Sequence, residues 1–394
     1  MKYRSEIDGL RALAVVPVVL FHAGISLFSG GFVGVDIFFV ISGYLITTIL
    51  IDDIENKRFS VVKFYERRAR RILPALFFVM LFCIVPSWIW MLPNHMKDFS
   101  QSLVAVSLFS SNILFWRESG YFAAAAEAKP LLHTWSLAVE EQYYLIFPIF
   151  LFFVWRLGKK SALTIIVAVA LASLLLSEWG WRVDADANFY LSPTRAWELF
   201  AGSIAAFIVL KSEVQKNNAL SLLGLMSILY SIFYLDSTFP FPSLYTLIPV
   251  LGTVLIVAYA GKGTLVAWIL SRRLFVGVGL ISYSLYLWHQ PLLAFARVNQ
   301  IHDEYINIWL VAISFIFSFL TWKYVERPFR GRLTISKEMV FTSSALGISI
   351  FLIFGLLGHI SGGFKSRFSN EVMHLVSFED EQSHLRDISC SPVE

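Results

Sequence analysis

The amino-acid sequence predicts an all-α protein that crosses a membrane many times. Of its 394 residues, 57% are hydrophobic and only 15% are charged, and the mean hydropathy is +0.66. Soluble domains carry about 25% charged and about 45–50% apolar residues. The apolar residues also gather in runs close to the roughly 20 residues that a transmembrane helix needs. This composition excludes a soluble enzyme, a disordered chain and a fibrous protein.

Eleven apolar runs are candidate transmembrane helices. They are residues 10–29, 32–51, 73–93, 138–156, 161–178, 197–211, 219–235, 244–260, 275–295, 307–323 and 338–358. We interpret the first as a transmembrane helix and not as a cleavable signal, because no small-residue cleavage site follows it. A weaker run, 97–116, contains several serines together with Gln101 and Asn112.

The positions of Lys and Arg predict the orientation of these runs. Cytoplasmic loops carry an excess of both residues, and most of the 32 basic residues fall on one side if eleven runs cross, starting inside. If 97–116 also crossed, the later basic clusters would lie outside. We therefore expect the N-terminus inside, 97–116 on the outer side without spanning, and the tail outside. No basic tract lies away from the membrane flanks, so no nucleic-acid partner is expected.

The chain is expected to divide after the tenth run. Residues 1–330 would form one bundle, 331–358 a basic loop and an eleventh helix, and 359–394 a polar tail with too few apolar residues to fold alone. The tail resembles the start of a linker to an outer domain. Cys83 is expected in the core, and an unpaired Cys390 suggests that its partner belongs to chain not present here.

Ionisable residues inside apolar runs are candidate functional residues, because burying them in a membrane is costly. Arg11 and His22 are eleven residues apart, so they project from nearly one helix face about 16 Å apart. A neutral His22 could act as general base or nucleophile, or only bond a neighbouring helix. Asp36 could orient its imidazole, as the carboxylate of a triad does, or pair with an unrelated helix.

Two further groups indicate binding at the two membrane faces. Arg68 and Arg71 would share a helix face at the inner surface, suited to the phosphates of a nucleotide donor or merely to lipid head groups. His133, Glu140 and Glu141 enter the fourth run from outside. Adjacent carboxylates repel, so at least one needs a partner. The candidate outer residues beside them are Arg195, Glu198, Tyr286 and His289.

These polar residues suit a hydroxylated acceptor such as a sugar, which aromatic faces can stack upon and carboxylates can hold. The alternative is a purely structural role, in which aromatic residues form a belt at the membrane interface together with a salt bridge. Glu326 and Arg327, which close the tenth run, are expected to be structural.

With these residues assembled, the chain resembles the acyltransferase-3 family of membrane O-acyltransferases, particularly bacterial O-antigen acetylases. The resemblance covers most of residues 5–330. The matching stretches are 7–14 (IDGLRALA), the Arg11–His22 pair, 31–46 (GFVGVDIFFVISGYLI), the Arg68–Arg71 pair, 133–137 (HTWSL), 195–198 (RAWE), 282–289 (SYSLYLWH) and 326–328 (ERP).

The resemblance implies a ten-helix acyltransferase bundle plus an eleventh helix in a bacterial inner membrane, with a periplasmic tail. It implies acetyl transfer from cytoplasmic acetyl-CoA, as co-substrate and without a metal, to a hydroxyl of a periplasmic or lipid-linked glycan such as O-antigen. His22 would be the central catalytic residue, Arg11 a donor contact, and Arg68 and Arg71 ligands of the CoA phosphates.

Many relatives continue into a periplasmic SGNH hydrolase-like domain. No Gly-Asp-Ser motif is found here, so this domain is expected to be absent, although an SGNH-type domain could be a partner.

The expected reaction brings the thioester up from the inner side to His22, which is oriented by Asp36. His22 either takes the proton of the sugar hydroxyl as that hydroxyl attacks, or is acylated first. The rival interpretation is a glycolipid or polysaccharide transporter without catalysis. No convincing internal repeat is found, which disfavours a transporter built from symmetric halves.

Overall fold

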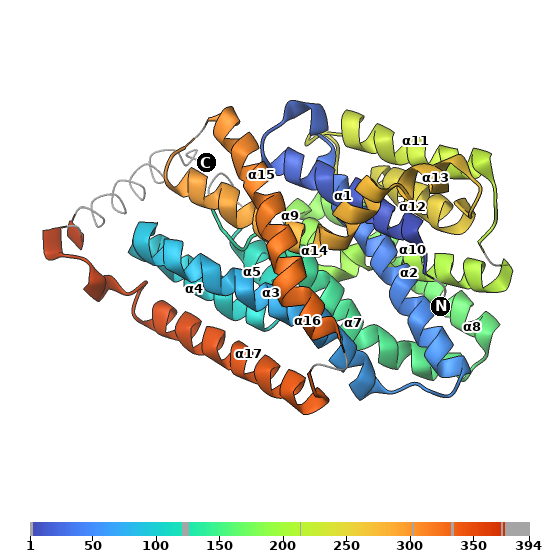
Figure 1. The fold of residues 1–394 in the computed structure, drawn as a ribbon, viewed down its shortest axis with the longest axis horizontal. Helices are drawn as coiled ribbons and strands as arrows, with labels where there is room; N and C mark the ends of the chain where they lie inside the picture. Colours follow the sequence, from blue (N-terminus) through green and yellow to red (C-terminus); the bar gives the residue numbers. More distant parts are fainter. Residues whose placement is uncertain are drawn as a thin grey trace.

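The computed structural model describes residues 3–119, 126–212, 214–301, 303–331, 335–371 and 373–374. Within these ranges the regular structure is helical, apart from one isolated bridge between Lys216 and Ala260 (Figure 1). The predicted roles of Cys390 and of the tail beyond residue 374 lie outside the described residues.

Sixteen α-helices are placed in the described ranges. They are α1 (Ser5–His22), α2 (Gly34–Glu55), α3 (Val61–Trp90), α4 (Pro93–Ser107), α5 (Ser111–Arg117), α7 (Thr134–Trp155), α8 (Lys159–Val183), α9 (Ala185–Tyr190), α10 (Ser192–Ser212), α11 (Asn218–Tyr234), α12 (Leu247–Tyr259), α13 (Leu265–Leu270), α14 (Arg273–Val298), α15 (Glu304–Thr321), α16 (Arg327–Arg330) and α17 (Lys337–Ile360).

Each of the eleven predicted runs overlaps one of these helices. Within the described ranges, six helical segments are long and apolar enough to cross a membrane: Gly31–Glu55, Val61–Trp90, Thr134–Trp155, Lys159–Val183, Glu304–Arg330 and Lys337–Ile360. The predicted all-α polytopic membrane protein agrees with this arrangement.

Side-chain caps explain where several helices begin. The hydroxyl of Ser60 accepts a hydrogen bond from the backbone N–H of Lys63 at the start of α3, and Ser336 caps α17 in the same way. Each cap satisfies one of the N–H groups that a helix start leaves without a partner. In α1, Glu6 and Asp8 lie in the first turn, where negative charge complements the helix dipole.

Two predicted runs are interrupted in the structure. The first, 10–29, does not continue as one helix, because α1 ends at His22 and short 3₁₀ turns at 26–28 and 31–33 lead into α2. The weaker run 97–116 is divided between α4 and α5, with Phe109 between them at φ 50°. That run therefore does not form one continuous helix across a membrane.

Glycines bring three central helices into backbone contact. A Cβ atom on Gly34 of α2 would lie 2.2 Å from the carbonyl oxygen of Ala14 on α1, and one on Gly43 would lie 1.8 Å from that of Leu199 on α10. From the opposite side, a Cβ on Gly202 of α10 would lie 2.0 Å from a backbone carbonyl of α2. Small residues allow this approach, so α1, α2 and α10 form a tightly packed frame.

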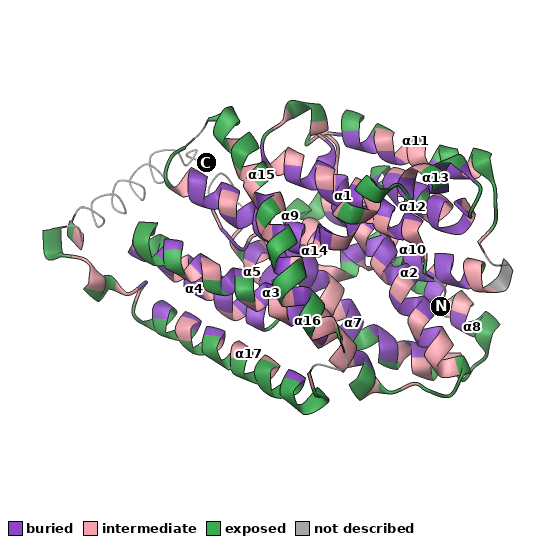
Figure 2. Ribbon diagram, viewed as in Figure 1, coloured by how far each residue is buried: buried purple, intermediate pink, exposed green. Residues whose placement is uncertain are grey.

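Buried residues gather on the inner faces of these central helices, whereas α17 lies along α4 at the edge of the bundle and exposes much of its length (Figures 1 and 2). Cys83 is buried as a free thiol, as the sequence predicts. The cationic partner of Glu326 is Arg330 and not the adjacent Arg327. A π-helical turn at Trp322–Glu326 precedes α16 and places Arg330 one turn beyond the carboxylate.

Candidate functional site

Three cavities follow one another through the centre of the bundle. The arginine cavity is lined by arginines near the start of α1 and α3. The middle cavity shares Arg11, Leu45 and Arg71 with it. The histidine cavity contains His22 and shares Val35 and Tyr286 with the middle cavity. Adjacent cavities thus share wall residues, and the three lie in series between the arginine cluster and His22.

The arginine cavity has more cations than carboxylates to neutralise them. Its arginines are Arg4, Arg11, Arg67, Arg70, Arg71 and Arg330. Asp8 lies 3.7 Å from Arg11 and accepts a hydrogen bond from the Tyr3 hydroxyl at 2.7 Å. That hydrogen bond raises the pKa of Tyr3 to about 12. Among the described residues, no carboxylate lies within ion-pair distance of Arg71.

Arg68 and Arg71 share a face of α3, as predicted, and both line the middle cavity. Only Arg71 also reaches the arginine cavity. The Arg68 guanidinium lies over the rings of Phe64 and Tyr144, at 5.9 and 5.6 Å from their centroids. These rings hold the guanidinium against the bundle, where it lines the middle cavity.

Glu140 lines the middle cavity. The prediction that it lies at the outer face beside Arg195 and Glu198 is therefore wrong. Glu140 accepts hydrogen bonds from the hydroxyls of Ser42 at 2.8 Å and Tyr144 at 2.6 Å. The reason is helix length: Glu140 follows His133 by seven residues, which is about 10 Å along α7. Glu141 lines none of the three cavities found in this part of the chain.

Three histidines and a tyrosine meet at the end of α1. The ring centroid of His289 lies 5.1 Å from that of His22 and 5.5 Å from that of His133. Tyr286 lies 5.3 Å from His133 and bonds its carbonyl at 2.8 Å. The structure thus brings together four sequence-predicted residues: His22 of α1, His133 just before α7, and Tyr286 and His289 of α14.

The tautomer of His22 follows from its hydrogen bond. Its Nδ1 lies 2.9 Å from the carbonyl oxygen of Val18, and a carbonyl can only accept, so Nδ1 carries the proton. In the neutral ring the Nε2 lone pair is then available as a base. His289 has the same arrangement, with Nδ1 at 2.7 Å from the carbonyl of Tyr286.

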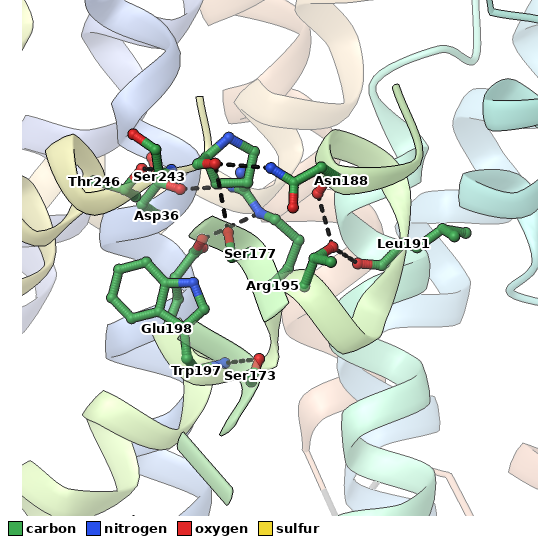
Figure 3. Close-up of polar contacts among 12 residues, drawn as sticks. Asp36, Ser173, Ser177, Asn188, Leu191, Arg195, Trp197, Glu198, Ser243 and Thr246 are labelled. Carbon is green, nitrogen blue, oxygen red and sulfur yellow. Dashed lines mark hydrogen bonds and ion pairs between the residues drawn. The ribbon is translucent and has the colours of Figure 1, made fainter. Parts of the chain in front are cut away.

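Asp36 does not orient His22, which corrects the triad interpretation. Its carboxylate accepts a hydrogen bond from Arg195 at 2.6 Å, and Glu198 lies 3.2 Å from the same guanidinium (Figure 3). All three side chains are at most 1% exposed. Although His22 and Asp36 lie on adjacent helices, Asp36 instead belongs to a buried ion cluster with α10, and the backbone of α1 fixes the imidazole.

Aromatic rings surround this ion cluster and line the histidine cavity. The Arg195 guanidinium lies 5.4–5.7 Å from the ring centroids of Phe39, Trp135, Phe189 and Phe241. Residues 236–241 form part of the cavity wall. The next residue, Pro242, accepts hydrogen bonds at its carbonyl from Asn188 at 2.7 Å and Ser177 at 3.4 Å (Figure 3). These bonds tie the wall to α8 and α9.

Two site residues were not singled out from the sequence. Ser42 holds Glu140, and Arg297 donates to the carbonyl of His22 at 2.6 Å. Ser42 stands within the quoted 31–46 stretch, but its partner is 98 residues away. Arg297 follows an apolar run and has the sequence signature of an interfacial anchor. In the described part of the chain, no group of three His, Cys, Asp or Glu side chains is placed to hold a metal ion.

Comparison with known proteins identifies the family. The family profile described as an acyltransferase domain, Acyl_transf_3, matches residues 4–325. Peptidoglycan O-acetyltransferase OatA of Listeria monocytogenes is 34% identical over an aligned length of 351 residues, and the match covers 84% of this chain and 56% of the relative. O-acetyltransferase OatA of Staphylococcus aureus strain NCTC 8325 is 30% identical over an aligned length of 351 residues, and the match covers 84% of this chain and 58% of the relative.

The chain thus spans somewhat more than half the length of these curated relatives. No solved structure matches it. The bundle that carries the three cavities coincides with the matched region. The chain belongs to the acyltransferase-3 family.

Proposed function

We propose that this protein transfers an acetyl group from acetyl-CoA, bound at one membrane face, to a glycan hydroxyl that arrives from the other. The observation that carries the proposal is the series of three neighbouring cavities with shared wall residues, which lie between the arginine cluster and His22. A donor and an acceptor could then meet inside the bundle without either crossing it.

The donor would enter through the arginine cavity. Arg71, whose guanidinium has no carboxylate partner in the described ranges, and Arg11 would contact the CoA phosphates, since guanidinium groups match phosphate oxygens. Arg68 would contact the donor further along, in the middle cavity. The extended pantetheine arm is comparable in length to the axial separation of Arg11 and His22, about 16 Å.

This placement gives the protein its proposed orientation. Acetyl-CoA is a cytoplasmic metabolite, so the arginine cavity and the N-terminus would face the cytoplasm. The histidine cavity would then open toward the periplasmic side of a bacterial inner membrane. The positive-inside distribution of Lys and Arg supports the same assignment.

His22 would act through Nε2, because Nδ1 is held by Val18. In a direct transfer, Nε2 takes the proton of the glycan hydroxyl while the hydroxyl oxygen bonds to the thioester carbonyl carbon. The carbon–sulfur bond then breaks, and the imidazolium returns its proton to the departing thiolate of CoA. In the alternative, Nε2 itself attacks the thioester carbonyl carbon, the carbon–sulfur bond breaks, and CoA leaves as its thiolate. The glycan oxygen then bonds to the acyl carbon as the carbon–Nε2 bond breaks, and the CoA thiolate takes up the hydroxyl proton.

The two routes differ in what the donor alone can do. A labelled acyl group attached to His22 after rapid quenching with acetyl-CoA alone would support the covalent route. Its absence under conditions where glycan addition gives turnover would support direct transfer.

The acceptor would lie in the histidine cavity, against His133, Tyr286 and the aromatic wall. Such a wall suits the apolar face of a sugar ring. The Listeria relative is named for peptidoglycan, so we propose a cell-envelope glycan, with peptidoglycan precursors to be tested beside lipid-linked O-antigen oligosaccharides. An SGNH-type domain, supplied by a separate polypeptide, could complete transfer to the final acceptor.

Acetyl-CoA binding and turnover by the purified protein test this proposal. We expect wild-type protein to bind acetyl-CoA, His22→Ala to bind it without transferring the acetyl group, and Arg68→Ala/Arg71→Ala to bind it weakly. A protein indifferent to acetyl-CoA, or a His22→Ala variant that still acetylates glycan, would overturn the proposal. Glycan transport without acetyl-CoA would instead support the transporter.

A further inference from the structure

We infer that Arg297 is a positioning residue for His22, which it holds through the backbone at the end of α1. This inference rests on the proposed catalytic role of His22. Arg297 lies at the end of α14, and its Nη2 donates to the carbonyl oxygen of His22 at 2.6 Å. The two residues are 275 positions apart in sequence.

The end of α1 needs such a partner because a helix leaves its last carbonyl groups unbonded. The carbonyls of Val19, Leu20 and Phe21 are satisfied locally by backbone N–H groups of the turn that follows. The His22 carbonyl is bonded from another helix, by Arg297. A cation there also complements the negative end of the helix dipole.

His22 is a terminal residue of α1, so the position of its ring depends on how firmly this last turn is held. Pro17 lies one turn before it and lacks the N–H that an uninterrupted helix would use. The bond from Nδ1 to Val18 fixes the ring relative to the turn. The bond from Arg297 fixes the turn relative to α14, which also carries His289.

The same guanidinium reaches the segment that leads to His133. Nη1 of Arg297 donates to the carbonyl of Glu127 at 3.2 Å, and Nη2 lies 3.2 Å from the Glu127 carboxylate. Gln290 of α14 donates to the carbonyls of Glu127 and Lys129 at 3.1 and 3.3 Å. Arg297 thereby joins the His22 end of α1, the His289 helix and the chain just before His133.

Loss of the hydrogen bond between Arg297 and the His22 carbonyl is expected to lower the rate of acetyl transfer more than it lowers the affinity for acetyl-CoA. A displacement of about 1 Å at a reacting group can cost about 10²-fold in rate. The arginine cavity lies at the other end of α1, beyond the middle cavity. Donor affinity therefore reports whether the rest of the bundle remains folded.

Three variants test the inference. Arg297→Met keeps the side-chain stem and removes every donor, and we expect kcat to fall about 10²-fold with an unchanged Kd for acetyl-CoA. Arg297→Lys retains a cationic donor group, so its kcat should be about tenfold higher than that of Arg297→Met. Glu127→Gln is the matched control: its carboxylate is 64% exposed, it leaves the bond to His22 in place, and its kcat should equal that of wild type.

The outcomes separate this inference from the proposed function. A wild-type kcat for Arg297→Met, with His22→Ala inactive, would overturn the role of Arg297 alone. Loss of acetyl-CoA binding in both Arg297 variants, without recovery by lysine, would show a general structural role and also overturn it. Activity in His22→Ala would overturn the proposed function itself.

Discussion

Removing Arg195 should destabilise the protein more than neutralising either of its carboxylate partners. Arg195→Met would leave Asp36 and Glu198 facing each other in a site where side chains are at most 1% exposed. Breaking a buried ion pair by removing one partner costs about 3–5 kcal/mol. With two carboxylates left unpaired, we expect the upper part of that range.

Asp36→Asn is the milder perturbation. The amide keeps an oxygen that can accept the bond from Arg195, and the guanidinium remains 3.2 Å from Glu198. Only the charge-assisted part of one hydrogen bond is lost, so we expect a cost of about 1–2 kcal/mol. Transfer activity should persist in this variant, because the carbonyl of Val18 and not Asp36 holds Nδ1 of His22.

A double-mutant cycle in the purified protein measures both effects. Unfolding free energies in detergent for Asp36→Asn, Arg195→Met and the double variant should show that the two losses are not additive, because the double variant leaves one unpaired carboxylate instead of two. Turnover is measured on the same samples. An Asp36→Asn protein with wild-type stability and no turnover would refute this reasoning, since the carboxylate would then be acting on the imidazole.

Three further predictions concern other parts of the bundle. Arg71→Gln should weaken acetyl-CoA binding about 10–100-fold, which is the contribution of one charge-assisted hydrogen bond. Arg67→Gln should leave the affinity unchanged, because that guanidinium already pairs with a carboxylate at 2.7 Å. Equal losses of affinity in the two variants, measured by calorimetry, would contradict the assignment of Arg71. Cys83 is fully buried, so maleimide should label it only after denaturation; rapid labelling at Cys83 in folded protein, located by peptide mass and counted apart from Cys390, would count against the packing of α3. Gly43→Ala should cost about 3 kcal/mol or more, because its Cβ would meet a backbone carbonyl at 1.8 Å, whereas Gly277→Ala, which meets nothing within 4 Å, should leave the unfolding free energy unchanged or raise it.

Apolar runs predicted the helices well because burial in a membrane constrains length and composition over about 20 residues. They did not predict that α1 would end at His22, since the residues that follow it are also apolar. That end is a local turn, in which Gly24 takes φ 81° and the backbone N–H groups of residues 23–25 bond the last carbonyls of α1. Spacing along one helix also predicted correctly that Arg68 and Arg71 share a face, and both line the middle cavity.

Contacts between side chains on different helices were predicted least well. Spacing along the sequence put Asp36 near His22, but it could not show that α10 approaches α2 closely enough for Arg195 to reach the carboxylate. Likewise, Glu140 was expected beside Arg195 and instead bonds Ser42 of α2. Such contacts depend on helix packing, which a single sequence without an alignment does not specify.

The glycine contacts between α1, α2 and α10 have a consequence for the working cycle. Helices whose backbones touch cannot slide or tilt against one another without collision, so this trio should stay nearly rigid during the proposed transfer. Any adjustment to the donor or the acceptor then falls to the side chains that line the three cavities. A change of acceptor over evolution would accordingly be easiest through substitutions at those cavity walls, with the backbones of the trio left in place.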